Sequence, residues 1–151
     1  MDWAFDITLK NRLILRDFLN DLTLEQLNKI PDGFANNIIW NIYHTLVTQQ
    51  ILVYTLSGLT PLIEDDLVTA YRKGTRPIAR VDQLNVEFVK RALISTIEKT
   101  KKDYVNGRFK TYTPYTTSTK STLNKVEDAI EFNNFHEGIH LGYILALRKS
   151  I

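Results

Sequence analysis

The sequence predicts an all-α protein, a four-helix bundle formed by a single domain over residues 1–151. Apolar residues recur at helical spacing in four long segments, and helix-capping or helix-terminating residues bound these segments. No two segments show the alternation expected of paired strands, so helices must pack on helices. With 151 residues, of which 44% are hydrophobic, the chain can bury one core without disulfides, and it contains no cysteine.

A long first helix and a short second one are expected near the N-terminus. Leucine and phenylalanine at approximately helical spacing predict a helix over about residues 6–22. Thr23 and Gln26 form a capping-box pattern, which predicts the start of a short helix. The turn-forming residues Pro31-Asp32-Gly33 should end this short helix.

A second long helix and a long connection follow. Either Asn36 or Asn37 can cap the N-terminus of this helix, which should continue until Gly58, a typical C-terminal cap. Residues 59–82 are less regular and predict a long connection between the second and third long helices, with one short helix near residues 65–73. Connections of this length are often functional or crossover segments.

Two further long helices complete the predicted bundle. The third is expected over residues 83–105, and Asn106-Gly107 should end it. Residues 111–119, rich in threonine and tyrosine with one proline, predict an extended loop. The fourth helix should cover about residues 124–149, because Asn124 stands three residues before a glutamate, as in a capping box.

The three histidines of the chain are the candidate functional residues. His136 and His140 are four residues apart in the fourth predicted helix, so both imidazoles point to the same side. Ala129 and Leu147 share that side and require burial, which turns it toward the bundle core. His44 lies on the inward side of the second long helix, so the three rings can meet and bind one divalent metal ion.

The ligand types limit the identity of this metal. Three neutral imidazoles leave the ion its double charge and open coordination positions, an arrangement that lowers the pKa of bound water. Zinc, nickel, iron and manganese all accept histidine, and the usual affinity order favours nickel or zinc over manganese. A single inward histidine is usually an ordinary core residue, but three with this spacing predict a metal site.

Residues 136–140 also spell the H-E-x-x-H motif of zinc proteases, in which the glutamate is the general base. Glu137 points about 100° away from His136, toward a neighbouring helix or solvent, so a salt-bridged or solvated carboxylate is the other interpretation. Residues 141–151 contain no His, Asp, Glu or Cys as a third ligand, and no strand pattern predicts a substrate-binding edge. The protease interpretation is therefore disfavoured.

Four more residues of this segment remain open to two interpretations. Asn133 and Tyr143 lie on the histidine side and are either contacts to a ligand histidine or a substrate, or polar groups of a helix interface. Gly138 and Gly142 are unusual inside a helix, where glycine costs about 1 kcal/mol relative to alanine. Such small residues allow another helix to approach closely or leave room beside the metal.

The histidine-bearing segments resemble those of the DinB-like (DinB/YfiT) superfamily. The similar stretches are residues 41–46, with one histidine in the second helix, and residues 132–144, with H-x-x-x-H followed by glycine. The resemblance extends over the whole chain in length and element order. It implies an up-down-down-up four-helix bundle, frequent homodimers, and a divalent metal held by His44, His136 and His140.

The three histidines lead us to expect a metal-dependent enzyme with a small-molecule substrate. Relatives include thiol-dependent S-transferases and isomerases that use bacillithiol, mycothiol or glutathione, which are low-molecular-weight thiols. Hydrolysis and thiol transfer both remain open, because most members have no assigned reaction. The alternative is a non-catalytic, metal-stabilised binding or stress-related protein.

Composition argues against nucleic-acid and membrane partners. The formal net charge of +2 is too small to predict a polyanionic partner. Basic clusters at residues 72–80 and 101–110 are better explained as solvated surface than as a nucleic-acid interface. No apolar run is long enough to span a bilayer, and the N-terminus lacks a signal-peptide pattern. Together with the absence of cysteine, these features lead us to expect a cytoplasmic protein.

Overall fold

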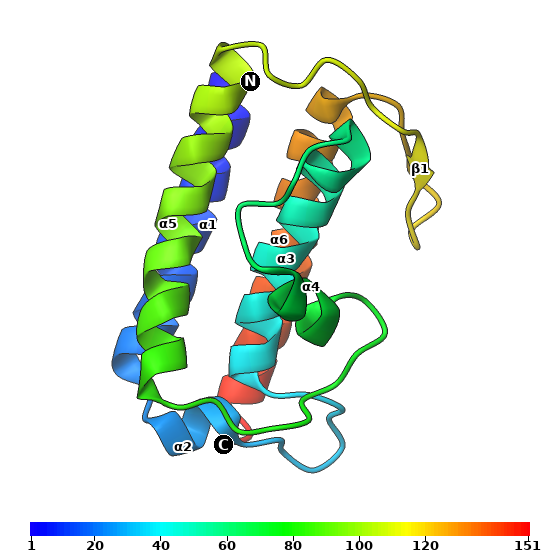
Figure 1. Cartoon of the computed structure of the whole chain (residues 1–151). Helices are drawn as coiled ribbons and strands as arrows, with labels where there is room; N and C mark the ends of the chain where they lie inside the picture. The colour runs from blue at the N-terminus through cyan, green and yellow to red at the C-terminus, as the bar shows by residue number, and fades with distance from the viewer.

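The computed structural model describes residues 1–151 and shows a bundle of four long helices (Figure 1). The long helices are α1 (Asp2–Asp21), α3 (Ile38–Val53), α5 (Gln83–Val105) and α6 (Val126–Arg148). The smaller elements are α2 (Leu24–Asn28), the 3-10 turn η1 (Thr55–Ser57), α4 (Asp65–Tyr71) and the strands β1 (Tyr115–Thr116) and β2 (Thr122–Leu123). The predicted all-α bundle is confirmed. None of the helices combines the length and apolar character needed to cross a membrane.

The four long helices run in two directions. In Figure 1, α1 and α6 descend, whereas α3 and α5 ascend. Side-chain pairs agree with this arrangement, since Thr8 and then Arg12 of α1 contact Asn134 and then Glu137 of α6 in the same order. Helix α1 packs against α5 and α6, and α3 packs against α6. Helices α3 and α6 are therefore antiparallel neighbours, which is the arrangement that brings their histidines together.

The core has two apolar clusters with buried polar residues between them. One cluster includes Leu15, Ile42, Leu93 and Ile144, and the other includes Phe5, Val53, Ile97 and Ile130. At intermediate positions along the same helices lie polar residues that are also buried: Thr8, Arg12, Thr45, Gln49, Gln50, Thr96, Thr100, Asn133 and Glu137. Polar groups in a core must be paired to be tolerated. This polar layer lies at the height of His44 and His136.

Local capping explains most helix boundaries. The Asn37 side chain accepts a hydrogen bond from the backbone N–H of Trp40 at 2.9 Å, and Thr23 and Gln26 form the predicted capping box. Helix α3 ends at Val53, earlier than predicted, and Gly58 instead caps the 3-10 turn η1, with a φ of 71° in the left-handed region that favours glycine. The predicted bounds of α5 match the structure.

Two further sequence-based details are wrong. Asn124 does not cap α6; Lys125 occupies that position without a side-chain cap, and the Asn124 backbone N–H donates instead to the Asp128 carboxylate at 2.8 Å. Residues 111–119 do not form only an extended loop, because β1 pairs with β2 as a short antiparallel hairpin. The Thr113 backbone N–H donates to the Leu56 carbonyl at 2.7 Å, which fixes the approach to this hairpin beside the C-terminal end of α3.

Candidate metal centre

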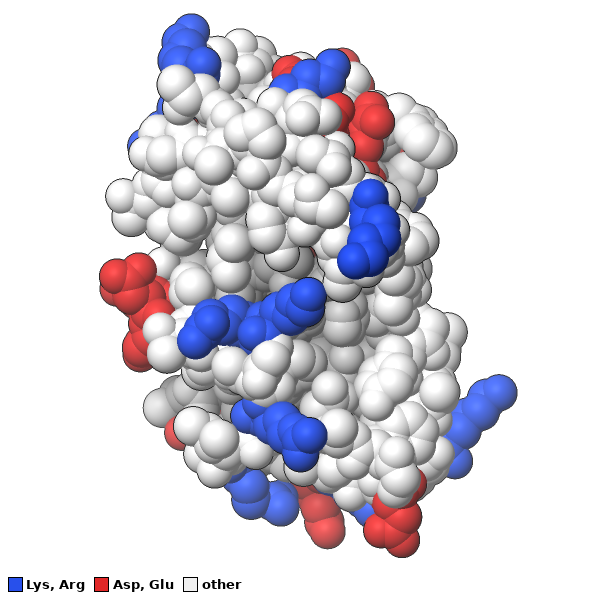
Figure 2. Space-filling model, turned by 90° about the vertical axis from the view of Figure 1, so that its right-hand side faces the viewer, with Lys and Arg blue, Asp and Glu red and all other residues white.

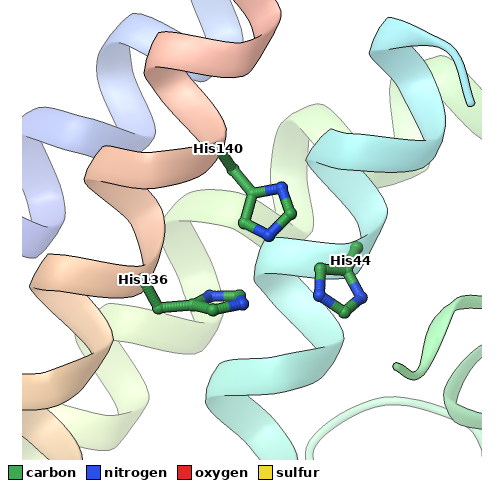
Figure 3. A group of neighbouring side chains, drawn as sticks. All are labelled: His44, His136 and His140. Carbon is green, nitrogen blue, oxygen red and sulfur yellow. The ribbon is translucent and has the colours of Figure 1, made fainter. Parts of the chain in front are cut away.

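The structure brings the three predicted histidines together in one cluster. His44 comes from the middle of α3, and His136 and His140 come from successive turns of α6. One ring nitrogen from each residue lies within 4.8 Å of the others. Figure 3 shows the three rings turned toward the space between α3 and α6. The inward direction predicted for both helix faces is therefore what the fold provides.

Hydrogen bonds fix the orientation of two of the rings. His44 Nδ1 donates to the backbone carbonyl of Tyr71 at 2.7 Å, and His140 Nδ1 donates to the side-chain carbonyl of Asn41 at 2.8 Å. Carbonyl oxygens only accept hydrogen bonds, so each Nδ1 carries the proton and each Nε2 keeps a lone pair. Histidine ligands of metals are typically oriented in this way.

Packing contacts hold the His136 ring and also support the His44 ring. His136 Nδ1 is buried without a hydrogen-bond partner, so the protein contacts that hold this ring are packing contacts. Trp40 stacks on His44 with ring centroids 4.8 Å apart and an interplanar angle of 9°. The Thr48 hydroxyl donates to His44 Nε2 at 3.3 Å, a weak bond that a stronger partner of this nitrogen can replace.

The environment keeps the imidazoles neutral. Burial lowers the pKa of His136 to about 3, and the neighbouring His140, His44 and Arg12 add to this effect. Burial, together with His44, lowers the pKa of His140 to about 4. Burial also lowers the pKa of His44, while its hydrogen bond to the Tyr71 carbonyl opposes the shift. Neutral imidazole is the form that binds metals, so the cluster is ready to bind at neutral pH.

The spacing fits a divalent ion after a small adjustment. Around a tetrahedral ion with metal–nitrogen bonds of roughly 2.0–2.1 Å, two ligand nitrogens lie roughly 3.3 Å apart. The nitrogens here lie within 4.8 Å of one another, so side-chain rotations that shorten the widest spacing by about 1.5 Å would complete the site. The donor set, the neutral rings and their fixed orientation all fit such an ion.

Glu137 belongs to the polar layer of the core, away from solvent. Its Oε1 accepts hydrogen bonds from Arg12 Nε at 2.8 Å and from Asn133 Nδ2 at 2.9 Å, and Arg12 Nη2 lies 2.7 Å away. The Glu137 and Arg12 side chains are both fully buried. The second Glu137 oxygen has no partner, and neither do Arg12 Nη1 and Asn133 Oδ1. The salt-bridged interpretation of this glutamate is the one the structure shows.

The other residues considered on α6 lie outside the histidine cluster. Asn133 bonds to Glu137, and Tyr143 packs against Phe34 with ring centroids 5.6 Å apart. A side chain added at Gly138 or Gly142 would meet nothing within 4 Å, so no helix of this chain packs closely there.

The histidines form part of the wall of a cavity of about 330 Å³. This volume lies near the lower limit for small-molecule sites. Its lining comes from α3, α6, the β1–β2 hairpin and Lys73, which follows α4. The histidine nitrogens are therefore accessible to a small molecule that enters the cavity.

Asn41 and Tyr71, which orient two of the histidines, were not identified from sequence, nor was Arg12, which pairs with Glu137 in the core beside them. Tyr71 acts through its backbone carbonyl, which no side-chain pattern reveals. The sequence does indicate that Arg12 is buried, because it stands four residues after Thr8 and three before Leu15 on the buried side of α1. A charged residue in such a position requires a buried partner.

Comparison with known proteins agrees with this geometry. A family model described as the DinB superfamily matches residues 8–144, a range that includes all three histidines. A comparison with curated proteins finds no match. Because the family model covers most of the chain, the chain belongs to the DinB superfamily.

Proposed function

We propose that the protein is a divalent-metal-dependent enzyme that acts on a small molecule, with His44, His136 and His140 as the metal ligands. One observation carries this proposal. The cluster contains three potential ligands and no nearby fourth His, Asp or Glu, and it forms part of a cavity wall. Structural zinc sites usually have four protein ligands, whereas catalytic sites have three and keep a position open for water or substrate.

The proposed metal is zinc or nickel, with iron or manganese as weaker candidates. All three ligands are imidazole nitrogens, and the chain has no cysteine to favour a softer ion. When bound, such an ion would act as a Lewis acid that activates a water or a thiol. The protein would hold the ligand rings in place through Tyr71 and Asn41 and would bind the substrate beside them.

Metal content is the first test. Protein purified without a histidine tag should contain about one zinc or nickel ion per chain by mass spectrometry, the stoichiometry of a single three-ligand site. His44→Ala, His136→Ala and His140→Ala should each reduce this content strongly. Tyr143→Phe is the matched control on α6, because Tyr143 does not line the cavity. Wild-type metal content in all three alanine variants would disprove the site.

The reaction class requires a second test. Hydrolysis and thiol-dependent S-transfer both use a metal with open positions. Metal-loaded protein should be assayed with bacillithiol, mycothiol or glutathione plus electrophilic acceptors, and separately with ester and amide substrates without thiol. Turnover that needs the thiol would assign the transferase, and turnover without it would assign the hydrolase. No turnover, with a sharp loss of thermal stability on chelation, would favour the non-catalytic, metal-stabilised alternative.

We also propose that two chains associate through the exposed face of α6. Leu145 is a large apolar residue on this helix that is about half exposed and lies outside the cavity lining. Gly138 and Gly142 lie on the same open surface and would let another helix approach closely. Analytical ultracentrifugation should give a dimer mass, and Leu145→Glu should shift it to the monomer. A monomeric wild-type protein at micromolar concentration would contradict this proposal.

A further inference from the structure

The cavity beside the histidines has extensive apolar walls. They are formed by Ile51, Leu52, Leu56, Phe132, Phe135 and Ile139. Phe135 is 53% exposed and Ile139 is 49% exposed, although both are large apolar residues next to the ligand histidines. Burying such side chains against a ligand is favourable, because apolar surface is removed from water. The walls therefore suit a ligand with an apolar body.

The charge around this cavity has one sign. Lys73 is the only charged residue in the lining, which contains no aspartate or glutamate. No carboxylate pairs with Lys73 in the structure. Figure 2 faces the side of the molecule that carries α4 and the hairpin, and shows a hollow with basic side chains beside it and acidic ones toward the edges. Lys73 therefore has no carboxylate partner within the cavity lining.

Hydroxyl groups from the hairpin line the same cavity. They belong to Thr117, Ser118 and Thr119. The Thr117 and Thr119 hydroxyls bond to each other at 2.9 Å, whereas the Ser118 hydroxyl makes no hydrogen bond within the protein. Hydroxyls can donate to an anion, and Lys73 supplies a full charge to attract one.

We propose that the cavity binds an organic acid with an apolar body, whose carboxylate is held by Lys73 and the hairpin hydroxyls. The inference rests on the proposed metal site and names the substrate class for it. The cavity would carry a net positive charge within partly apolar walls. The charge would come from a divalent ion on three neutral histidines and from Lys73, and no carboxylate in the lining would offset it. Such a site attracts anions and repels cations. The end of the ligand away from the carboxylate would lie at the histidines.

Three probes with the same metal-binding head group test the inference. They are octanohydroxamic acid, suberic acid monohydroxamate and omega-aminooctanohydroxamic acid, whose far ends are a methyl group, a carboxylate and an ammonium group. Isothermal titration into zinc-loaded full-length protein should rank the carboxylate probe tightest and the ammonium probe weakest. The carboxylate should improve affinity over methyl by roughly twofold to fivefold, as for a partly exposed ion pair.

Variants of the lysine assign this preference to a residue. Lys73→Met should abolish the carboxylate preference, Lys73→Arg should keep it, and Lys73→Glu should reverse the order of the charged probes. Lys102→Met is the matched control, an exposed lysine on α5 outside the cavity. All of these variants should keep wild-type zinc content, because Lys73 is not among the proposed metal ligands.

The outcomes separate this inference from the proposed function. Equal affinity for the three probes, or an unchanged preference in Lys73→Met, would overturn the organic-acid inference and leave the metal site intact. Failure of zinc to bind would overturn the metal site and this inference with it. Failure of every hydroxamate to bind zinc-loaded protein would overturn this inference and the open coordination position, and would leave the metal site intact. Acetohydroxamic acid should bind more weakly than octanohydroxamic acid; equal binding would contradict the role of the apolar walls.

Discussion

The buried ion pair between Arg12 and Glu137 makes a sharp prediction, because Glu137 also occupies the glutamate position of an H-E-x-x-H motif. Both side chains are fully buried, and their closest atoms are 2.7 Å apart. Glu137→Gln keeps the size of the side chain and removes its charge, which leaves the Arg12 guanidinium without a counter-ion in the core. We expect a loss of stability with little loss of metal.

The magnitude follows from the geometry. Two charges whose centres lie about 4 Å apart attract by about 4 kcal/mol at an effective dielectric constant of about 20. Removing one partner of a buried pair typically costs about 3–5 kcal/mol. Glu137→Gln should therefore lower the free energy of unfolding by about 3 kcal/mol or more, which corresponds to a melting temperature lower by roughly 10 °C.

The assay is urea denaturation of metal-free protein followed by circular dichroism, with zinc content measured in parallel. Glu131→Gln serves as the control, since Glu131 is exposed on the same helix and forms no ion pair. The double variant Arg12→Met, Glu137→Met should be less destabilised than the sum of its single variants, because it leaves no unpaired charge. If Glu137→Gln retains wild-type stability but loses zinc or turnover, the carboxylate acts at the metal and the structural assignment is refuted.

Three further predictions concern the histidines and the open face of α6. Asn41→Ala removes the acceptor of His140 Nδ1 and should weaken zinc affinity roughly tenfold to a hundredfold, as measured by chelator competition; unchanged affinity would contradict the orienting role. The unfolded chain protonates histidine below about pH 6.5, whereas the folded-state pKa is about 3 for His136 and about 4 for His140, so metal-free protein should lose stability as the pH falls from about 6.5 to 4. Melting curves in EDTA test this, and His136→Asn should flatten the pH dependence. Gly142→Ala should raise the stability of the monomer by about 1 kcal/mol in urea titrations, and it should weaken the dimer if α6 is its interface; sedimentation distinguishes the two effects.

The predictable part of the site depended on local geometry. A spacing of four residues places His136 and His140 on one side of a helix whatever the rest of the fold does. Ala129 and Leu147 lie on the same side and predicted that it faces the core, and both are fully buried in the structure. The C-terminal bound of α5 was predicted for a similar reason, because Asn106-Gly107 directly follows the helix in sequence.

The unpredicted part depended on contacts between distant segments. The Tyr71 carbonyl reaches His44 only because α4 packs on α3, where Tyr71 stacks on Tyr43 with centroids 4.3 Å apart. The pairing of Arg12 with Glu137 requires the parallel alignment of α1 and α6, which helical periodicity leaves undetermined. The hairpin and Lys73 line the cavity because two long connections bring them there. The paths of these connections are determined by tertiary packing.

The position of the histidines along the chain has a consequence for chain entropy. His44 and His140 are nearly a hundred residues apart, so an ion bound to both would close a loop that includes most of the protein. In the loop-closure description of cross-links, a loop of that length restricts the unfolded chain by roughly 4–5 kcal/mol. In a chain without cysteine, the ion would thus act as the cross-link that a disulfide provides in other proteins, and chelation would release it.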